Sequence, residues 1–571
     1  MSFIGTTVRQ RKGRIFPGTG PTRTFFRENF SERTTEETGV DPLIATSAPV
    51  VSTCAKQLIK FNTPDNFFGG KVSQFLHNWY KITSDTWLFK QITGYQLEFI
   101  SKPVQYALPH QIKFSDIELK YVDTEVQKLL TKRVIERVTY REKDEFISSI
   151  FLRPKKDGTY RLILNLKHLN RDVEHVHFKM ETLKSAVTLM TNNCWFASID
   201  LKDAYYSIPV DAVDRKYLRF IWQGVCYQFT CLPNGLSSAP TIFAKIMKPV
   251  FSQLRKMGFS NVAYIDDSLL QADTHQQCVS NVETTVRMMD SLGLTIHPDK
   301  SVITPTQCIT FLGFILNSVD MTVRLTKEKA DKLVCDCNTL LKTREVTIRQ
   351  LAQVIGKMVA CTAAVPHAPL FIKTLEHEKD SSLKLAKGNF EQTVELSSEA
   401  RQQVLWWINN IHSSASLVYR GSPDMTLETD SSMTGWGGLV KGDHTLRTGG
   451  HWSYSEQNNH INYLELLAAF LKLQCFCESK SNIHVRLYMD NTVAVNYLTN
   501  MGGKKPLLPD LTRKIWLWCK MRDIWLSVSH LPGAVNTEAD KLSRKLSDDM
   551  EWKLNTDVFH RLTRYCLTFL T

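Results

Sequence analysis

Two adjacent carboxylates, Asp266 and Asp267, lie between two apolar stretches, Val262–Ile265 and Ser268–Leu270. This pattern predicts a short β-hairpin whose turn carries both acids. Like charges side by side are unfavourable unless a cation lies beside them. Upstream, the apolar run Trp195–Ile199 leads directly into Asp200. Three carboxylates at the ends of neighbouring strands can hold two Mg²⁺ ions, which clamp the attacking and leaving oxygens of a phosphoryl transfer.

A second group of acids lies in the last third of the chain. Met425–Asp430 and Ile483–Asp490 are predicted strands that each end in an aspartate, and Asn536–Arg544 is a predicted helix. Glu465 interrupts the apolar predicted helix Ile461–Cys477, where an unpaired carboxylate is costly. Any one of these acids, taken alone, is better explained as a helix cap or a solvated surface group. Together they form a second candidate set of metal ligands: Asp430, Glu465, Asp490 and Asp540.

Basic residues surround one predicted turn. Residues 146–170 have the pattern of strand, turn and strand, with Lys155-Lys156-Asp157-Gly158 as the turn. One interpretation is a solvated, charged turn. The other is a basic finger that reaches over a triphosphate, because Lys156 and Arg161 flank the turn.

Composition favours a polyanionic partner. Lys+Arg 70 against Asp+Glu 57 gives a formal net charge of +13, and nucleic acid fits this excess better than a membrane. The thirteen cysteines lack paired zinc-binding spacing, and two CxC pairs fall in predicted helices, so reduced intracellular thiols are expected. No apolar run reaches the ~18 residues of a membrane span. The N-terminus lacks the apolar region of a secretory signal.

Structural elements are expected from about residue 60 onwards. Residues 1–57 are predicted to be a flexible basic arm, with a localisation signal or a nucleic-acid tether as alternatives. Helical patterns cover Phe67–Phe99, Phe114–Val138, Val279–Leu292 and most of Thr326–Ile411. Strands that alternate with helices between them indicate a palm-like α+β layer, and a second α/β unit follows Gly421-Ser422-Pro423.

Several motifs resemble those of one enzyme family. Ile199–Tyr205, Leu232–Pro240 and Tyr264–Asp267 resemble the successive palm motifs of reverse transcriptases, and the second α/β unit resembles the RNase H domain of retroelements. The resemblance is closest to DIRS-type retrotransposons, which carry a tyrosine recombinase in place of an integrase. Further similar stretches are Phe146–Phe151, His177–Glu181, Trp436, His460–Leu467 and His530–Gly533.

The resemblance implies a multidomain α+β and α/β fold: a right-hand polymerase with fingers, palm and thumb, then an RNase H-like domain. The expected domains are the arm 1–57, fingers and palm 58–320, a helical thumb or connection 321–420, the RNase H-like domain 421–548 and a tail 549–571.

Site residues follow from the same resemblance, position by position. Asp200, Asp266 and Asp267 correspond to the polymerase carboxylates and metal ligands, with Asp200 and Asp266 as the first choice for direct ligands of both metals. Lys156 and Arg161 would bind the incoming triphosphate, Tyr205 would exclude a ribose 2′-hydroxyl, and Lys300 would assist pyrophosphate departure. Phe311–Gly313 matches the primer grip. The chain departs from the pattern at Asn234, where relatives usually carry Phe or Gln, and this affects fidelity and template contacts more than activity.

In the second unit, Asp430, Glu465, Asp490 and Asp540 correspond to the RNase H quartet, and His530 to the loop histidine of that domain. The expected function is RNA- and DNA-directed DNA synthesis with hydrolysis of RNA in RNA–DNA hybrids. Two Mg²⁺ ions are expected at each site, with Mn²⁺ as an alternative. The expected partners are an RNA template, a DNA primer, their hybrid, dNTPs and a tyrosine recombinase, inside the cell in cytoplasm or nucleus.

Two other hypotheses stay open. An LTR-type or pararetroviral polymerase has the same motifs, and the neighbouring coding sequence would distinguish it from a DIRS-type element. A co-opted, inactive nucleic-acid-binding scaffold belongs to a different functional class. Loss of an acid from either site would favour that scaffold, and no acid is missing.

Overall fold

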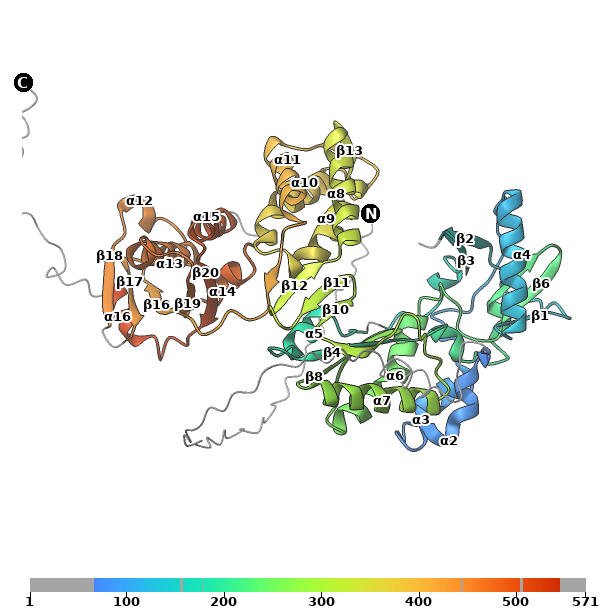
Figure 1. Ribbon diagram of the computed structural model, residues 1–571. Helices are drawn as coiled ribbons and strands as arrows, with labels where there is room; N and C mark the ends of the chain where they lie inside the picture. The colour runs from blue at the N-terminus through green and yellow to red at the C-terminus, as the bar shows by residue number, and fades with distance from the viewer. Residues whose placement is uncertain (1–65, 155–157, 177, 443–444, 504–506, 545–571) are drawn as a thin grey trace, which may run out of the picture. The chain divides into compact units, whose positions relative to one another are not determined.

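The computed structural model describes residues 66–154, 158–176, 178–442, 445–503 and 507–544 (Figure 1). The expected arm 1–57, the tail 549–571 and Lys156 lie outside these ranges. Within them the chain has the expected mixed, multidomain α+β and α/β fold. None of the described helices is long and apolar enough to cross a membrane.

Helices precede the first sheet. They are η2 (Lys71–Phe75), α2 (Leu76–Trp79), α3 (Thr86–Gly94) and α4 (Asp116–Thr131). The predicted helix Phe114–Val138 was wrong beyond Thr131, because Arg133 turns to φ 55° and Val134 leads into β1 (Ile135–Arg137). A capping box of Ser115 and Glu118 begins α4, since the serine accepts from one orphan amide and the glutamate from another.

Two small sheets follow in the region expected to form the fingers. β2 (Ile150–Pro154) and β3 (Tyr160–Leu164) are an antiparallel hairpin, as predicted. β1 pairs with β6 (Val225–Phe229), which pairs with β5 (Arg219–Trp222). Short 3-10 helices connect these elements: η3 (Leu169–Arg171), η4 (Ala204–Ser207) and η5 (Arg215–Tyr217).

A four-stranded sheet, which we call the palm sheet, has the strand order β7-β8-β4-β9. Its strands are β4 (Trp195–Asp200), β7 (Ser260–Tyr264), β8 (Asp267–Ala272) and β9 (Val302–Thr306). α6 (Ala239–Lys256) and α7 (His275–Ser291) pack against it (Figure 1), and α5 (Leu183–Leu189) precedes β4. Buried side chains such as Ala197, Ile246 and Met289 form one hydrophobic core, whereas Phe196 belongs to a second. β7 lies at an edge of the sheet.

The next region is mainly helical, as predicted for Thr326–Ile411. It contains α8 (Lys327–Lys342), α9 (Ile348–Cys361), η6 (Thr362–Ala364), η7 (Ala368–Phe371), α10 (Lys373–Leu385) and α11 (Ser398–Asn410). β13 (Glu345–Thr347) and β14 (Thr393–Glu395) form a pair that the helical pattern did not predict. A further sheet has the order β10-β11-β12-β15. Its strands are β10 (Cys308–Phe311), β11 (Phe314–Asn317), β12 (Thr322–Leu325) and β15 (Ser416–Leu417).

The C-terminal α/β unit is built on a five-stranded sheet of order β18-β17-β16-β19-β20. The strands are β16 (Met425–Ser431), β17 (Gly435–Lys441), β18 (Leu446–His451), β19 (His484–Met489) and β20 (Trp525–His530). β16, β19 and β20 are parallel, so their carboxyl ends lie at the same end of the sheet. The helices are α12 (Tyr454–Gln457), α13 (Ile461–Cys477), α14 (Thr492–Thr499), α15 (Leu508–Lys520) and α16 (Thr537–Arg544).

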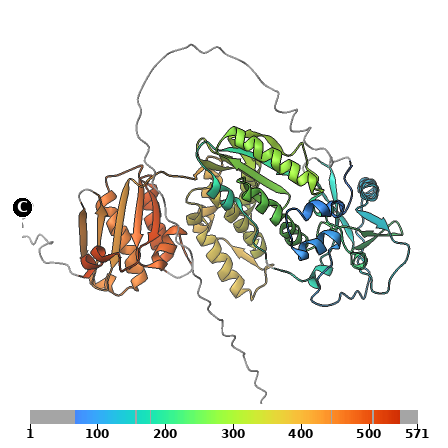
Figure 2. The ribbon, with the colours of Figure 1, turned by 90° about the horizontal axis from the view of Figure 1, so that it is seen from below.

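Two consecutive glycines in β17 let helices approach both faces of this sheet. A Cβ on Gly437 would meet the α16 backbone at Leu542 and Ser543, and one on Gly438 would meet Lys472 of α13. Since successive residues of a strand face opposite sides, α16 and α13 cover opposite faces (Figure 2). The carboxyl end of β16, which carries Asp430, is thus covered by a helix on each face of the sheet.

Candidate active sites

The first candidate site lies at the tip of the β7–β8 hairpin. Tyr264 pairs with Asp267, which leaves Ile265 and Asp266 as a two-residue turn. Ile265 has φ 57°, a conformation that is unfavourable for a β-branched residue. Such strain is most often found at functional sites, where the surrounding structure holds it in place.

Strand register brings Asp200 to the same tip. Asp200 at the end of β4 pairs with Asp267 at the start of β8, and the Leu201 amide donates to the Asp266 carbonyl over 2.8 Å. The Asp200 amide donates to Ser301 Oγ (3.0 Å). The three acids predicted from the sequence therefore lie together.

Electrostatics at this tip disfavour three ionised carboxylates. Burial, together with the charges of Asp200 and Asp266, raises the pKa of Asp267 to about 7. Burial also raises the pKa of Asp200, where Lys300 opposes the shift and Asp266 adds to it. Lys300 Nζ lies 4.0 Å from Asp200 Oδ1 and its side chain is exposed. A cation near Asp200 and Asp267 would relieve this repulsion.

Two neighbouring tyrosines have different surroundings. Tyr206 is buried, and its hydroxyl accepts from the Asn234 amide over 3.0 Å. Tyr205 is half-buried, its ring lies edge-on to Phe243 at 5.7 Å, and burial and the charge of Asp266 raise the pKa of its phenol. Tyr206 thus packs the core, and Tyr205 lies toward the acids.

The Leu232–Pro240 loop is held by a residue that the sequence analysis did not single out. Asn170 Nδ2 donates to the Gly235 carbonyl and Asn170 Oδ1 accepts from the Ser237 amide, each over 2.9 Å. Gly235 has φ 107°, and a Cβ there would lie 2.8 Å from the Leu164 carbonyl. Arg161 on β3 is exposed, and its charge opposes the burial that raises the pKa of Tyr206.

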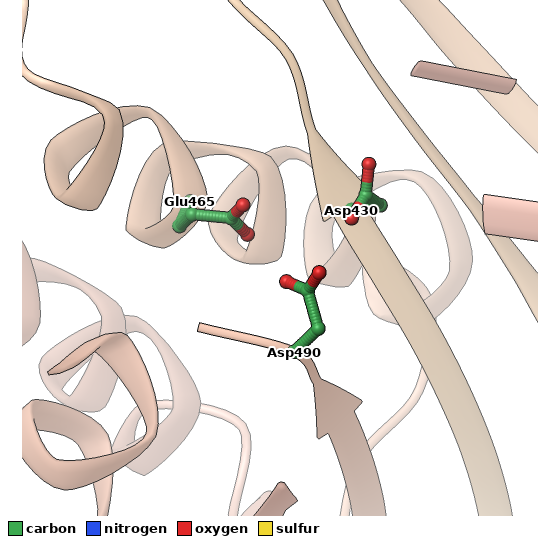
Figure 3. A group of neighbouring side chains, drawn as sticks. All are labelled: Asp430, Glu465 and Asp490. Carbon is green, nitrogen blue, oxygen red and sulfur yellow. The ribbon is translucent and has the colours of Figure 1, made fainter. Parts of the chain in front are cut away.

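The second candidate site joins three of the four acids predicted in the C-terminal unit. Figure 3 shows Asp430 from β16, Glu465 from α13 and Asp490 just after β19 pointing toward one another. Each offers an oxygen within 4.8 Å of the others. Within the described ranges this is the only such group of three, so Asp200, Asp266 and Asp267 converge less closely.

Burial makes this group strongly unfavourable when ionised. Burial raises the pKa of Glu465 to about 9, and the charges of Asp430 and Asp490 add to the shift. Burial likewise raises the pKa of Asp430 to about 6, although a hydrogen bond from Ser543 opposes it. Glu465 Oε2 is buried and has no hydrogen-bond partner. A hard cation such as Mg²⁺ fits these residues, since it prefers oxygen ligands and would satisfy the orphaned oxygen.

Asp540 and His530 lie near this group rather than in it. Asp540 on α16 is close enough for its charge to raise the pKa of Asp430, and it forms an ion pair with Arg544 at 2.6 Å. His530 ends β20 opposite Met489, one residue before Asp490, and is exposed.

At the second site, sequence reasoning missed two supporting residues. Ser543 Oγ donates to Asp430 Oδ2 over 2.7 Å, and both side chains are buried. The fully buried Asn536 donates to the Thr429 carbonyl over 3.1 Å, beside Asp430. Ser543 lies three residues after Asp540, a helical spacing that places both on one face and was a usable signal.

The first candidate site lies within a segment that matches a known protein family. Residues 153–316 match the family Reverse transcriptase (RNA-dependent DNA polymerase). The chain is 22% identical over 464 residues to the enzymatic polyprotein of Cauliflower mosaic virus (strain CM-1841), covering 78% of this chain and 64% of the polyprotein. It is 23% identical over 405 residues to the transposon Tf2-3 polyprotein of Schizosaccharomyces pombe, covering 68% of this chain and 28% of the polyprotein. The family match covers residues 153–316, and the chain spans less than two thirds of the length of these relatives.

Among solved structures, the chain is similar to the foamy viral protease-reverse transcriptase. The complex of its dRH form with ds DNA has 16% identity and a TM-score of 0.49, covering 90% of this chain and 85% of that one. The complex with an RNA/DNA hybrid has 17% identity and a TM-score of 0.47, covering 90% and 67%.

Proposed function

We propose that the chain is an RNA-directed DNA polymerase that also copies DNA templates. The observation that carries this proposal is the pairing of Asp200 with Asp267, with Asp266 in the adjoining turn, inside the segment that matches the reverse transcriptase family. Acids on neighbouring strand ends suit a two-metal phosphoryl transfer, in which the primer 3′-oxygen attacks the α-phosphate of a dNTP.

Each residue has a stated task in this reaction. Asp200 and Asp266 would hold two Mg²⁺ ions, or Mn²⁺ in their place, and Asp267 would stay beside them. The ions would supply the positive charge that stabilises the attacking and leaving oxygens. Arg161 and Lys156 would bind the triphosphate, and Tyr205 would contact the sugar. Asn234 holds Tyr206, the neighbour of Tyr205, and Lys300 lies close enough to Asp200 to meet the departing pyrophosphate.

The test is extension of a DNA primer on an RNA template by the purified chain with dNTPs and Mg²⁺. Asp266→Asn should abolish extension while primer–template binding persists, because one ligand is lost and the fold keeps its shape. Asp273→Asn is a matched control on the exposed residue just past the far end of β8. Extension by Asp266→Asn at the wild-type rate would contradict the proposal.

A second activity, hydrolysis of RNA in RNA–DNA hybrids, is proposed for the C-terminal unit. Three convergent acids and the orphaned Glu465 oxygen support it. Two ions would be held by Asp430, Glu465 and Asp490, with Asp540 nearby. The exposed His530 would contact the reacting strand or the product. The measurement is cleavage of labelled RNA in an RNA–DNA hybrid. Wild type should cleave the RNA, and Asp490→Asn should not.

The type of element is a further proposal. The motif resemblance supports a DIRS-type retrotransposon, whose tyrosine recombinase would be a partner alongside template, primer, hybrid and dNTPs, in cytoplasm or nucleus. The similarity to a caulimovirus polyprotein and a Tf2 polyprotein favours the alternative, a pararetroviral or LTR-type polymerase. A recombinase gene beside the coding sequence would decide for the first. The second alternative, an inactive nucleic-acid-binding scaffold, would bind RNA–DNA hybrids but show neither primer extension nor RNA cleavage.

A further inference from the structure

The stretch His177–Glu181 resembles the family yet has no task in the reaction above. Its last residue, Glu181, lies just before α5 and reaches the edge strand β7. Glu181 Oε2 accepts a hydrogen bond from the Ala263 amide over 2.7 Å. Ala263 pairs with Ser268, next to the turn-closing pair of Tyr264 and Asp267. At alternate positions of an antiparallel pair the amide and carbonyl point away from the partner strand, so this amide belongs to the open edge.

Arg255, in the last turn of α6, completes the contact. Its Nη2 donates to Glu181 Oε1 over 2.6 Å and to the Asn261 carbonyl over 3.0 Å. Asn261 precedes Ala263 by two residues, so its carbonyl lies on the same open edge. Glu181 and Arg255 together therefore bind one acceptor and one donor of β7, as a neighbouring strand would. We call this set of contacts the edge clamp.

The edge clamp lies close to the metal-binding turn. Ala263 is three residues before Asp266, and the intervening Ile265 holds the unfavourable φ of 57°. A strained turn keeps its geometry only if the flanking strands are fixed. Pairing with β8 fixes β7 on one side, and the edge clamp fixes it on the open side.

We propose that Glu181 is a positioning residue for the polymerase site: with Arg255 it fixes β7 and thereby sets Asp266 against Asp200. This inference rests on the proposed polymerase function. The pair is partly exposed, with side-chain exposures of 34% for Glu181 and 42% for Arg255. Exposed ion pairs contribute little to stability, so the role depends on the contacts with the β7 backbone.

Amide hydrogen exchange tests the geometry without any activity measurement. In the full chain, Glu181→Ala should speed exchange of the Ala263 amide by about tenfold or more, because an unpaired edge amide opens to water. Glu181→Gln keeps an acceptor oxygen and should retain most of the protection. Glu283→Ala, which removes an exposed ion pair with Arg287 on α7, is the matched control and should change nothing. Unchanged exchange at Ala263 in Glu181→Ala would overturn the proposal.

Single-turnover extension tests the positioning role. With saturating dNTP, Glu181→Ala should lower the rate about tenfold, since small displacements of reacting groups are costly. The dNTP KM, primer–template Kd and melting temperature should stay near wild type, and Glu181→Gln should restore most of the rate. A purely structural role would instead lower the melting temperature and the active fraction while leaving the rate per active site unchanged. Faster exchange with an unchanged rate would also overturn the proposal. If the wild-type chain fails to extend primers, the polymerase function falls and the positioning role with it, while exchange still reports on the edge clamp.

Discussion

Without divalent cations, Glu465→Gln is expected to stabilise the C-terminal unit at pH 7 while abolishing the proposed RNA cleavage. Glu465 is 3% exposed, and its Oε2 has no hydrogen-bond partner. Burial, with the charges of Asp430 and Asp490, raises the pKa of this carboxyl from 4.5 to about 9. The wild-type chain therefore folds at a cost in free energy that a neutral glutamine avoids.

Proton binding determines the sign and size of this effect. At pH 7 the unfolded chain has released the Glu465 proton and the folded chain still binds it, so wild-type stability falls as pH rises above 4.5. At 1.36 kcal/mol for each pKa unit, the cost is about 3 kcal/mol at pH 7. It vanishes near pH 4, where both states are protonated. The new amide needs its own partners, so about 3 kcal/mol is the upper limit of the gain.

The assay is thermal unfolding in EDTA from pH 4 to pH 8. Glu465→Gln should match wild type at pH 4 and melt higher at pH 7, by up to roughly 10 °C. Glu478→Gln, on the exposed residue that follows α13, is the control and should follow wild type throughout. Mg²⁺ should raise the melting temperature of wild type more than that of the variant, since it binds only the folded site. Equal stability at pH 7, or a difference independent of pH, would refute the reasoning.

Three further predictions concern the two sites and nucleic-acid binding. Tyr205→Ala should raise the ratio of kcat/KM for ribonucleotides to that for deoxyribonucleotides about tenfold for each 1.4 kcal/mol of lost discrimination, and an unchanged ratio would assign Tyr205 to packing alone. Ser543→Ala should weaken Mg²⁺ binding at the C-terminal site about tenfold or more, because it removes a buried hydrogen bond to the Asp430 carboxylate, whereas Ser543→Thr should retain it; calorimetric titration measures both. Primer–template affinity should fall steeply with salt, and a flat plot of log K against log salt would contradict a basic binding groove.

The sequence predicted elements well where hydrophobic periodicity was continuous. The predicted helix Ile461–Cys477 coincides with α13, and the predicted strand Ile483–Asp490 extends one residue beyond β19 at each end. The helix predicted for Phe114–Val138 ended early because a single residue, Arg133, turns to positive φ. Periodicity does not register such a turn, since Val134 still continues the apolar pattern.

The acids that lie together at the two candidate sites were predictable, because carboxylates stand out at the ends of apolar strands and, for Glu465, inside an apolar helix. Their supports were not, because the contacts join residues distant in sequence. Ser543 meets Asp430 across 113 residues, and Glu181 meets Ala263 across 82. Apart from the helical spacing of Ser543 from Asp540, nothing local marks these residues as partners. Only the fold brings α16 against β16 and the segment before α5 against β7.

The most direct test of two independent sites is one experiment with two readouts. Wild type, Asp266→Asn and Asp490→Asn are given the same RNA–DNA primer–template, and primer extension and RNA cleavage are measured together. Asp266→Asn should lose extension and keep cleavage, whereas Asp490→Asn should lose cleavage and keep extension, because each acid belongs to a different sheet. Equal loss of both activities in either well-folded variant would contradict two separate sites.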